Sequence, residues 1–100
     1  MSAAKIVEDV IKANVIAVFS KSYCPYCTRV KKALPSLNQS SIKILELDEM
    51  SNGSELQNSL AEKTGQRSVP NIFINGTHVG GCDDFFAKQK SGEIEKLLKQ

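Results

Sequence analysis

The chain has 100 residues, of which 41% are hydrophobic and 24% charged, and its formal net charge is +2. These values are ordinary for a globular protein, and we expect a single domain over residues 1–100. The charge is too small to indicate a nucleic-acid partner, and no apolar run approaches the length of a membrane span. Three cysteines are an odd number, which argues against a fully paired disulfide scaffold. Because no signal-peptide pattern is seen either, we expect a reducing compartment and a cytoplasmic location.

Two elements are predicted before the first cysteine. Apolar residues recur at helical spacing from Ala3 to Ile11, and Ser2 can cap the start of this helix. The residues from Val15 to Ser20 are rich in β-branched and aromatic types, which predicts a buried strand.

The stretch that carries chemistry follows this strand and reads Lys21-Ser22-Tyr23-Cys24-Pro25-Tyr26-Cys27. Pro25 suits the first position of a helix, so Cys24 is expected at the helix N-cap or just before it. Unpaired backbone N–H groups and the positive end of the helix dipole favour a thiolate there, and the thiolate is the nucleophile. Cys27 lies about one turn deeper. The spacing therefore predicts an attacking cysteine, Cys24, and a resolving cysteine, Cys27.

Two other interpretations of the cysteines stay open. A structural disulfide would need an oxidising compartment, which nothing in the sequence indicates. A zinc site would need four ligands, and the chain offers Cys24, Cys27, His78 and Cys82. However, this Cys-x-x-Cys pair follows an apolar strand and opens a helix, a setting that favours thiol chemistry over zinc. We expect His78 on the protein surface.

Basic residues cluster around the cysteine pair. We expect Arg29, Lys31 and Lys32 to lie on a solvated face of the cysteine-bearing helix. Lys21, immediately before the turn, is the better candidate for contact with an acidic ligand.

A strand and a helix are predicted in the middle of the chain. Pro35 should stop or kink the cysteine-bearing helix, and residues 36–41 form a loop. Residues 42–47 predict a second strand, which is parallel to the first because a helix connects them. Asn52 and Glu55 then resemble a capping box, at the start of a helix that ends near residue 65.

The last part of the chain predicts a hairpin and two helices. Residues 71–74 and 77–79 are strands joined by a type I′ turn at Asn75-Gly76. A helix begins at Cys82, and a short final helix follows residue 92. The order of elements predicts an α/β fold with a four-stranded mixed sheet flanked by helices.

Three segments in this order resemble the dithiol glutaredoxins, a branch of the thioredoxin-fold superfamily. They are residues 21–27, Thr64-Gly65-Gln66-Arg67-Ser68-Val69-Pro70-Asn71-Ile72-Phe73-Ile74, and Gly80-Gly81-Cys82-Asp83-Asp84. The resemblance implies a thioredoxin-like fold and a glutathione-disulfide oxidoreductase. Its implied partners are glutathione, as a co-substrate and not a tightly bound cofactor, and glutathionylated or disulfide-containing proteins. A monomer without a metal, nucleic acid or membrane is expected.

The same resemblance implies a role for each matched residue. Cys24 would form the mixed disulfide with the glutathione sulfur, and Cys27 would resolve protein disulfides. Lys21 would help to stabilise the thiolate and would meet the glycyl carboxylate of glutathione. Gln57 and Arg67 match family positions that can face the same carboxylate.

The remaining implied contacts involve the glutathione main chain and its γ-glutamyl end. Val69 would pair with the tripeptide through its backbone, as an added strand does, and the peptide bond before Pro70 is cis in this family. Tyr26 would shield the thiolate. The γ-glutamyl end would bind at a helix N-terminus formed by Gly81, Cys82, Asp83 and Asp84.

Two rival functions stay open, a related enzyme, thioredoxin, and a protein of another class, an iron–sulfur carrier. A thioredoxin is disfavoured because the chain has no tryptophan and carries Cys-Pro-Tyr-Cys. A carrier in which two chains share an iron–sulfur cluster through Cys24 and two glutathiones is the second rival. Pro25 stiffens the turn and Cys27 offers a competing disulfide, so thiol–disulfide exchange remains the preferred function.

Overall fold

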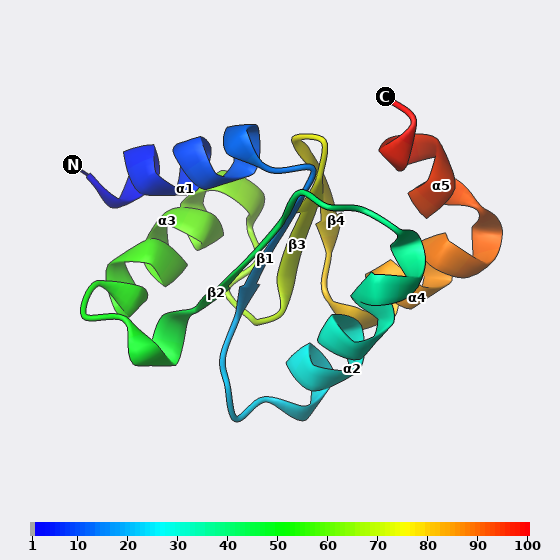
Figure 1. Ribbon diagram of the computed structural model, residues 1–100. Coiled ribbons are helices and arrows are strands. Elements are labelled where there is room, and N and C mark those ends of the chain that lie inside the picture. The colour runs from blue at the N-terminus through cyan, green and yellow to red at the C-terminus, as the bar shows by residue number, and fades with distance from the viewer. Residues whose placement is uncertain (1) are drawn as a thin grey trace.

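The computed structural model describes residues 2–100 and places helices on both faces of a four-stranded mixed sheet (Figure 1). The strands lie in the order β2-β1-β3-β4; their bounds are β1 Ile16–Ser20, β2 Ile42–Glu46, β3 Asn71–Ile74 and β4 Thr77–Gly80. β2 is parallel to β1, whereas β3 is antiparallel to both β1 and β4. The helices are α1 (Ala3–Ala13), α2 (Pro25–Ala33), α3 (Gly53–Thr64), α4 (Cys82–Ser91) and α5 (Glu93–Leu98).

Each face of the sheet carries its own hydrophobic core. α1 and α3 cover one face, where their apolar side chains pack on Phe19 and Phe73. α2, α4 and α5 cover the other face, packing on Val18 and Ile72 among others. Phe19 and Val18 belong to β1, and Phe73 and Ile72 belong to β3, so both strands are buried on both faces of the sheet. Because successive side chains of a strand point to opposite faces, such strands are nearly continuous apolar runs in the sequence.

The topology brings four separate segments together at one end of the strands. β1 and β2 run in the same direction, so the turn that leads to Cys24 and the segment after Glu46 leave the sheet at the same end. β3 runs the opposite way and begins at this end, directly after Pro70. β4 finishes here at Gly80, where α4 follows. Residues far apart in the sequence therefore meet beside the cysteine pair.

Most predicted boundaries are confirmed to within one or two residues. Ser2 caps α1 by accepting a hydrogen bond from the Lys5 N–H at 3.1 Å. Asn75 and Gly76 both have positive φ, at 47° and 81°, as a type I′ turn requires. After α2 ends at Ala33, the chain continues as a short 3₁₀ helix, η1 (Leu34–Leu37), where a loop was expected from residue 36.

The predicted capping box at the start of α3 is wrong. Asn52 does occupy the N-cap, but its φ and ψ of −104° and 19° are not extended, and its side chain makes no capping bond. A second short 3₁₀ helix, η2 (Leu47–Glu49), precedes it, and Gly53 packs so closely on Leu47 that a side chain would overlap the Leu47 carbonyl oxygen. This close contact, rather than a side-chain cap, positions the start of α3.

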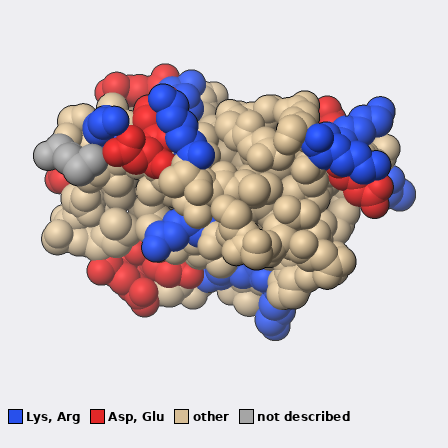
Figure 2. Space-filling model, turned by 45° about the horizontal axis from the view of Figure 1, so that its top comes forward, with Lys and Arg blue, Asp and Glu red and all other residues tan. Residues whose placement is uncertain are grey.

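Charges are mixed on the surface. On the face that Figure 2 shows, lysine and arginine side chains lie beside aspartate and glutamate at both ends of the molecule, with an uncharged area between them. No helix within residues 2–100 has the length and apolar character needed to span a membrane.

Candidate active site

Cys24 occupies the N-cap of α2, as predicted. Its backbone is extended, with φ −85° and ψ 118°, and Pro25 is the first helical residue. The Cys24 sulfur accepts a hydrogen bond from the Cys27 N–H at 3.4 Å, so it satisfies one of the free donors of the first turn. Cys24 is partly exposed. It therefore combines a preorganised donor with access from solvent.

The surroundings of Cys24 favour its thiolate. Partial burial would by itself raise the pKa of the Cys24 thiol, but hydrogen bonds from Cys27 and from the Tyr26 N–H, together with the positive charge of Lys31, outweigh it and lower that pKa. A lowered pKa places more Cys24 in the nucleophilic form at neutral pH.

Cys27 has the opposite character. It is completely buried, and this burial raises the pKa of its thiol, with a further contribution from the neighbouring Cys24. The Lys21 backbone and the Ser20 hydroxyl oppose that effect without reversing it. Cys27 is thus the less acidic of the two thiols and lies one turn from the more acidic Cys24, which fits the predicted division into an attacking and a resolving cysteine.

A surface groove of about 370 Å³ lies next to Cys24. One wall is the segment before β3, where the Val69–Pro70 peptide bond is cis, as expected, and the Val69 carbonyl oxygen lies 3.9 Å from the Cys24 sulfur. Of the predicted glutathione-binding residues, seven line this groove: Tyr26, Val69, Pro70, Gly81, Cys82, Asp83 and Asp84.

The opposite wall of the groove is the start of α4. Gly81 is its N-cap, and the Gly81 N–H donates a hydrogen bond to the Asp84 carboxylate at 3.1 Å. Cys82 is buried, which raises the pKa of its thiol, and Asp83 is exposed. The two exposed acids and the free N–H groups of this first turn give the wall donors for an anion and acceptors for an ammonium group.

Three predicted binding residues lie outside the lining of the groove. Gln57 donates a hydrogen bond to the Arg67 carbonyl at 2.8 Å, and the Arg67 guanidinium bonds to the Asn58 side chain. These two residues therefore come together, as the prediction requires. Lys21 lies before Cys24 with its side chain half buried, and its charge acts on Asp48.

The expectation that Lys31 lies on a solvated face is wrong. Its side chain is 23% exposed, and its ammonium group forms an ion pair with Glu46 at 2.7 Å. Lys31 packs toward the sheet because it lies on the same side of α2 as Cys24 and Cys27. Arg29 and Lys32 are exposed, as expected, and the Arg29 guanidinium lies over the ring of Phe86 at 5.5 Å.

Sequence reasoning also missed three polar residues near the site. Asp48 accepts hydrogen bonds from the N–H and the hydroxyl of Ser22 and so holds the turn before Cys24. Gln66 donates to the carbonyls of Ser68 and Pro70, at 3.0 and 2.9 Å, and supports the cis segment. Ser68 lines the groove. No spacing signal marks Asp48, because it contacts the turn only through the sheet pairing of β1 and β2.

The four residues of the zinc alternative do not form a cluster. Within residues 2–100, no group of three or more His, Cys, Asp or Glu side chains is placed to hold a metal ion. His78 is exposed, as predicted, and its ring bonds to the Asn71 side chain at 2.8 Å and packs on Phe73.

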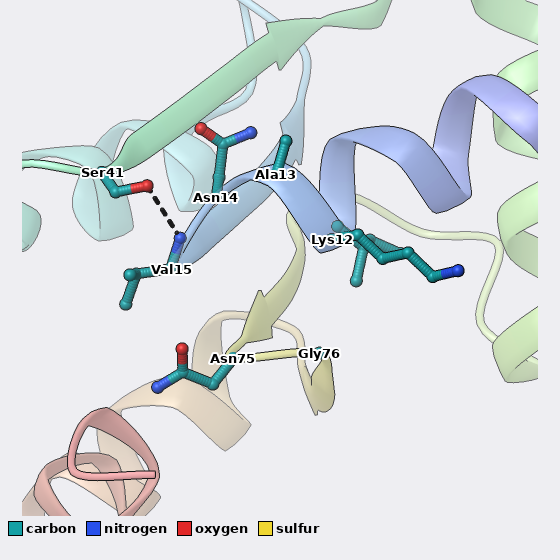
Figure 3. A pocket seen from close by; sticks show the side chains of 8 residues that line it. Lys12, Ala13, Asn14, Val15, Ser41, Asn75 and Gly76 are labelled. Carbon is teal, nitrogen blue, oxygen red and sulfur yellow. Dashed lines mark hydrogen bonds between the residues drawn. The ribbon is translucent and has the colours of Figure 1, made fainter.

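A second hollow, of about 380 Å³, lies at the other end of the sheet (Figure 3). Several of its polar groups are engaged within the protein: the Val15 N–H donates to the Ser41 hydroxyl at 3.0 Å, and the Asn75 amide donates to the Leu97 carbonyl at 2.7 Å. Its lining contains no thiol, acid or histidine. The groove beside Cys24 is therefore the better candidate, although the two are similar in size.

Comparisons with known proteins agree with this site. The sequence profile of the glutaredoxin family matches residues 16–79. Glutaredoxin-C6 of Oryza sativa is 54% identical over 100 residues, covering all of this chain and 88% of its own length. A glutaredoxin of Ricinus communis is 52% identical over 93 residues, covering 93% of this chain and 90% of its own.

Solved structures show the same fold. The holo form of glutaredoxin C1 from Populus tremula x tremuloides superposes with a TM-score of 0.89 at 44% identity, covering 97% of this chain and 95% of that one. A buckwheat glutaredoxin–glutathione complex superposes with a TM-score of 0.91 at 41% identity, covering 97% and 87%. With its thioredoxin-like fold and its Cys24-Pro25-Tyr26-Cys27 site, the chain belongs to the glutaredoxin family of glutathione-dependent thiol oxidoreductases.

Proposed function

We propose that the chain reduces protein–glutathione mixed disulfides through Cys24 alone and protein disulfides through Cys24 and Cys27 together. The observation that carries this proposal is the pairing of a partly exposed Cys24, whose thiol pKa is lowered, with a buried Cys27, whose thiol pKa is raised, beside a groove lined by Val69 and the start of α4. Glutathione is a tripeptide with carboxylates at both ends, and such a ligand suits a groove with backbone on one wall and a helix N-terminus on the other.

The monothiol route has two exchange steps. The Cys24 thiolate attacks the glutathione sulfur of the mixed disulfide, a Cys24–glutathione disulfide forms, and the protein thiolate leaves and takes up a proton. A glutathione thiolate then attacks the glutathione sulfur bound to Cys24, which forms glutathione disulfide and releases Cys24 as a thiolate. The lowered pKa of Cys24 favours both its ionisation before the first step and its departure in the second.

The dithiol route uses Cys27. The Cys24 thiolate attacks a protein disulfide, and one protein sulfur leaves. Cys27 then loses its proton and attacks the Cys24 sulfur, which releases the second protein thiol and leaves a Cys24–Cys27 disulfide. The hydrogen bond from the Cys27 N–H to the Cys24 sulfur keeps the two residues one turn apart and ready for this step.

The groove would bind glutathione in one orientation. Its γ-glutamyl carboxylate would meet the N–H groups at the start of α4, with Asp83 or Asp84 accepting the ammonium group. Its main chain would pair with the Val69 backbone. Its glycyl carboxylate would face Lys21, Gln57 and Arg67. The relative crystallised with glutathione supports a tripeptide as the ligand of this site.

We also propose that the chain acts as a cytoplasmic monomer. Both reacting sulfurs and the groove come from one chain, so the reaction needs no second copy. Free thiols at positions 24 and 27 need a reducing compartment to remain free between cycles.

A pair of coupled assays tests the proposal. Reduction of a small mixed disulfide is followed as NADPH consumption, once with glutathione and glutathione reductase and once with thioredoxin reductase. We expect turnover only in the glutathione system, and none with Cys24→Ser, because a hydroxyl is not activated to attack sulfur at neutral pH. Turnover that depends on thioredoxin reductase instead would contradict the proposal.

A further inference from the structure

On the face of the sheet that α2 covers, the last residues of β1 and β2 are polar, whereas the residues before them are apolar. Along this face β1 and β2 present apolar side chains that join the core, and then each strand ends in a polar residue. These polar residues, Ser20 and Glu46, are direct partners in the parallel pairing. The apolar positions before them are Ile16, Val18, Ile42 and Ile44. The polar end of the face lies under the start of α2, where the cysteines are.

Glu46 uses this position to hold Lys31. The two side chains are each 23% exposed, and the ion pair measures 2.7 Å. Lys31 lies about two turns after Cys24 on the same side of α2, and helical side chains point toward the helix N-terminus. The ammonium group therefore reaches back toward Cys24. It is the positive side chain that lowers the pKa of the Cys24 thiol.

The arrangement is not one that packing alone favours. The Oε1 atom of Glu46 is buried and finds no hydrogen-bond partner within residues 2–100. An unsatisfied buried acceptor costs free energy, and a half-buried ion pair often stabilises a fold no better than apolar residues do. An apolar residue at position 46 would also continue the row of Ile42 and Ile44. Packing therefore does not explain why position 46 carries a carboxylate.

We propose that Glu46 is a positioning residue for Cys24: it holds the Lys31 ammonium group on the cysteine-bearing side of α2 and offsets part of its charge. This inference rests on the proposed role of Cys24 as the nucleophile and names the residues that tune it. Lys31 raises the thiolate content of Cys24, and Glu46 both places that charge and limits its effect.

The other groups around Cys24 do not supply this charge. Cys27 from α2 and Cys82 from α4 are thiols whose pKa values are raised, mainly by burial, so both are neutral at pH 7. Lys21 from the preceding turn acts on Asp48, which lies on η2. Lys31 is the charged side chain that lowers the pKa of the Cys24 thiol, and Glu46 is its ion-pair partner.

The test measures the alkylation rate of Cys24 by iodoacetamide between pH 4 and 9, with the modified peptide identified by mass spectrometry. Glu46→Gln keeps an oxygen that can hold Lys31 but removes the negative charge, so the midpoint of the pH–rate curve of Cys24 should move to lower pH. Lys31→Met, with Lys31→Gln as a second variant, removes the positive charge, so the midpoint should move to higher pH. On the rising part of the curve we expect changes of about two- to threefold in thiolate content, in opposite directions, since a half-buried charge moves a nearby pKa modestly.

Exposed neighbours provide matched controls. Lys32→Met and Glu49→Gln remove charges of the same sign from solvent-facing positions on α2 and η2, and we expect unchanged curves for both. A Glu46→Gln curve that stays the same or moves to higher pH would overturn the inference, as would a Lys31 effect matched by Lys32. A different result would contradict the proposed function itself: Cys24 of the unchanged chain would then react with iodoacetamide no faster than Cys27 at pH 5. Melting curves confirm that each variant is folded.

Discussion

Replacing Gly80 by alanine should disturb the groove through Asp84. Gly80 ends β4 with φ +116°, a backbone conformation that residues with a Cβ rarely adopt. A Cβ built there would overlap the Asp84 carboxylate. That carboxylate is the acceptor of the Gly81 N–H, at 3.1 Å, at the start of α4. The substitution therefore acts on both the strand end and the helix cap.

The size of the effect follows from these two contributions. Holding a non-glycine residue at such a φ costs about 1–3 kcal/mol. Displacing the capping carboxylate costs about 1 kcal/mol more. A total loss of about 3 kcal/mol in the free energy of unfolding corresponds to a fall in Tm of about 12–24 °C for a domain of this size. We also expect a higher KM for glutathione, because Asp84 moves away from the groove wall.

A double-mutant cycle separates the collision from the backbone cost. Unfolding free energies are measured by denaturant titration for Gly80→Ala, Asp84→Ala and the double variant. Gly80→Ala should cost about 1 kcal/mol less when Asp84 is already absent, because no carboxylate is left to displace. Gly76→Ala is the matched control, since Gly76 also has positive φ but no atom lies within 4 Å of its Cβ position. Strict additivity in the cycle, or equal losses for Gly80→Ala and Gly76→Ala, would refute this reasoning.

Three further predictions concern the ligand, the pH dependence and the fold. Arg67→Ala should raise the KM for glutathione several-fold while changing kcat little, because it removes a partly exposed contact of about 1 kcal/mol that the ground and transition states share; steady-state kinetics would show it, and an unchanged KM would remove Arg67 from the site. Partial desolvation of its ring, which packs on Phe73, lowers the pKa of His78 below 6.5, so protonation of the unfolded chain reduces stability as the pH falls through that range. His78→Asn should therefore lose less Tm between pH 7.5 and pH 5.0 than the unchanged chain does, and an equal loss would count against this assignment. Gly53→Ala should lower Tm by about 10–20 °C, as a side chain there overlaps the Leu47 carbonyl oxygen, and a thermal melt within a few degrees of that of the unchanged chain would contradict this.

Local patterns in the sequence were enough to predict the elements and the reacting groups. The apolar run before the cysteines, Pro25 after Cys24 and the Asn75-Gly76 turn each specify a conformation through their own residue types, and the structure confirms all three. The position of Cys24 at a helix N-cap needed only Pro25 and the spacing to Cys27.

Contacts that cross between elements could not be predicted in the same way. From the sequence, Lys31 could not be distinguished from the other basic residues of its helix. Its partner Glu46 is 15 residues away, and the two side chains come into contact only when β2 pairs with β1. Asp48 and Ser22 are 26 residues apart and depend on the same pairing. At the start of α3, a side-chain cap was expected from sequence spacing alone, but backbone packing of Gly53 on Leu47 determines the geometry.

The most direct test of the account compares Cys24→Ser and Cys27→Ser on two substrates, a glutathionylated peptide and a protein disulfide, each with excess glutathione and glutathione reductase. Cys24→Ser should lose both activities. Cys27→Ser should keep reduction of the glutathionylated peptide, because glutathione completes that cycle, and should lose much of its activity on the protein disulfide. Equal loss of both activities in Cys27→Ser would contradict a monothiol step at Cys24, and retained activity in Cys24→Ser would contradict its role as the nucleophile.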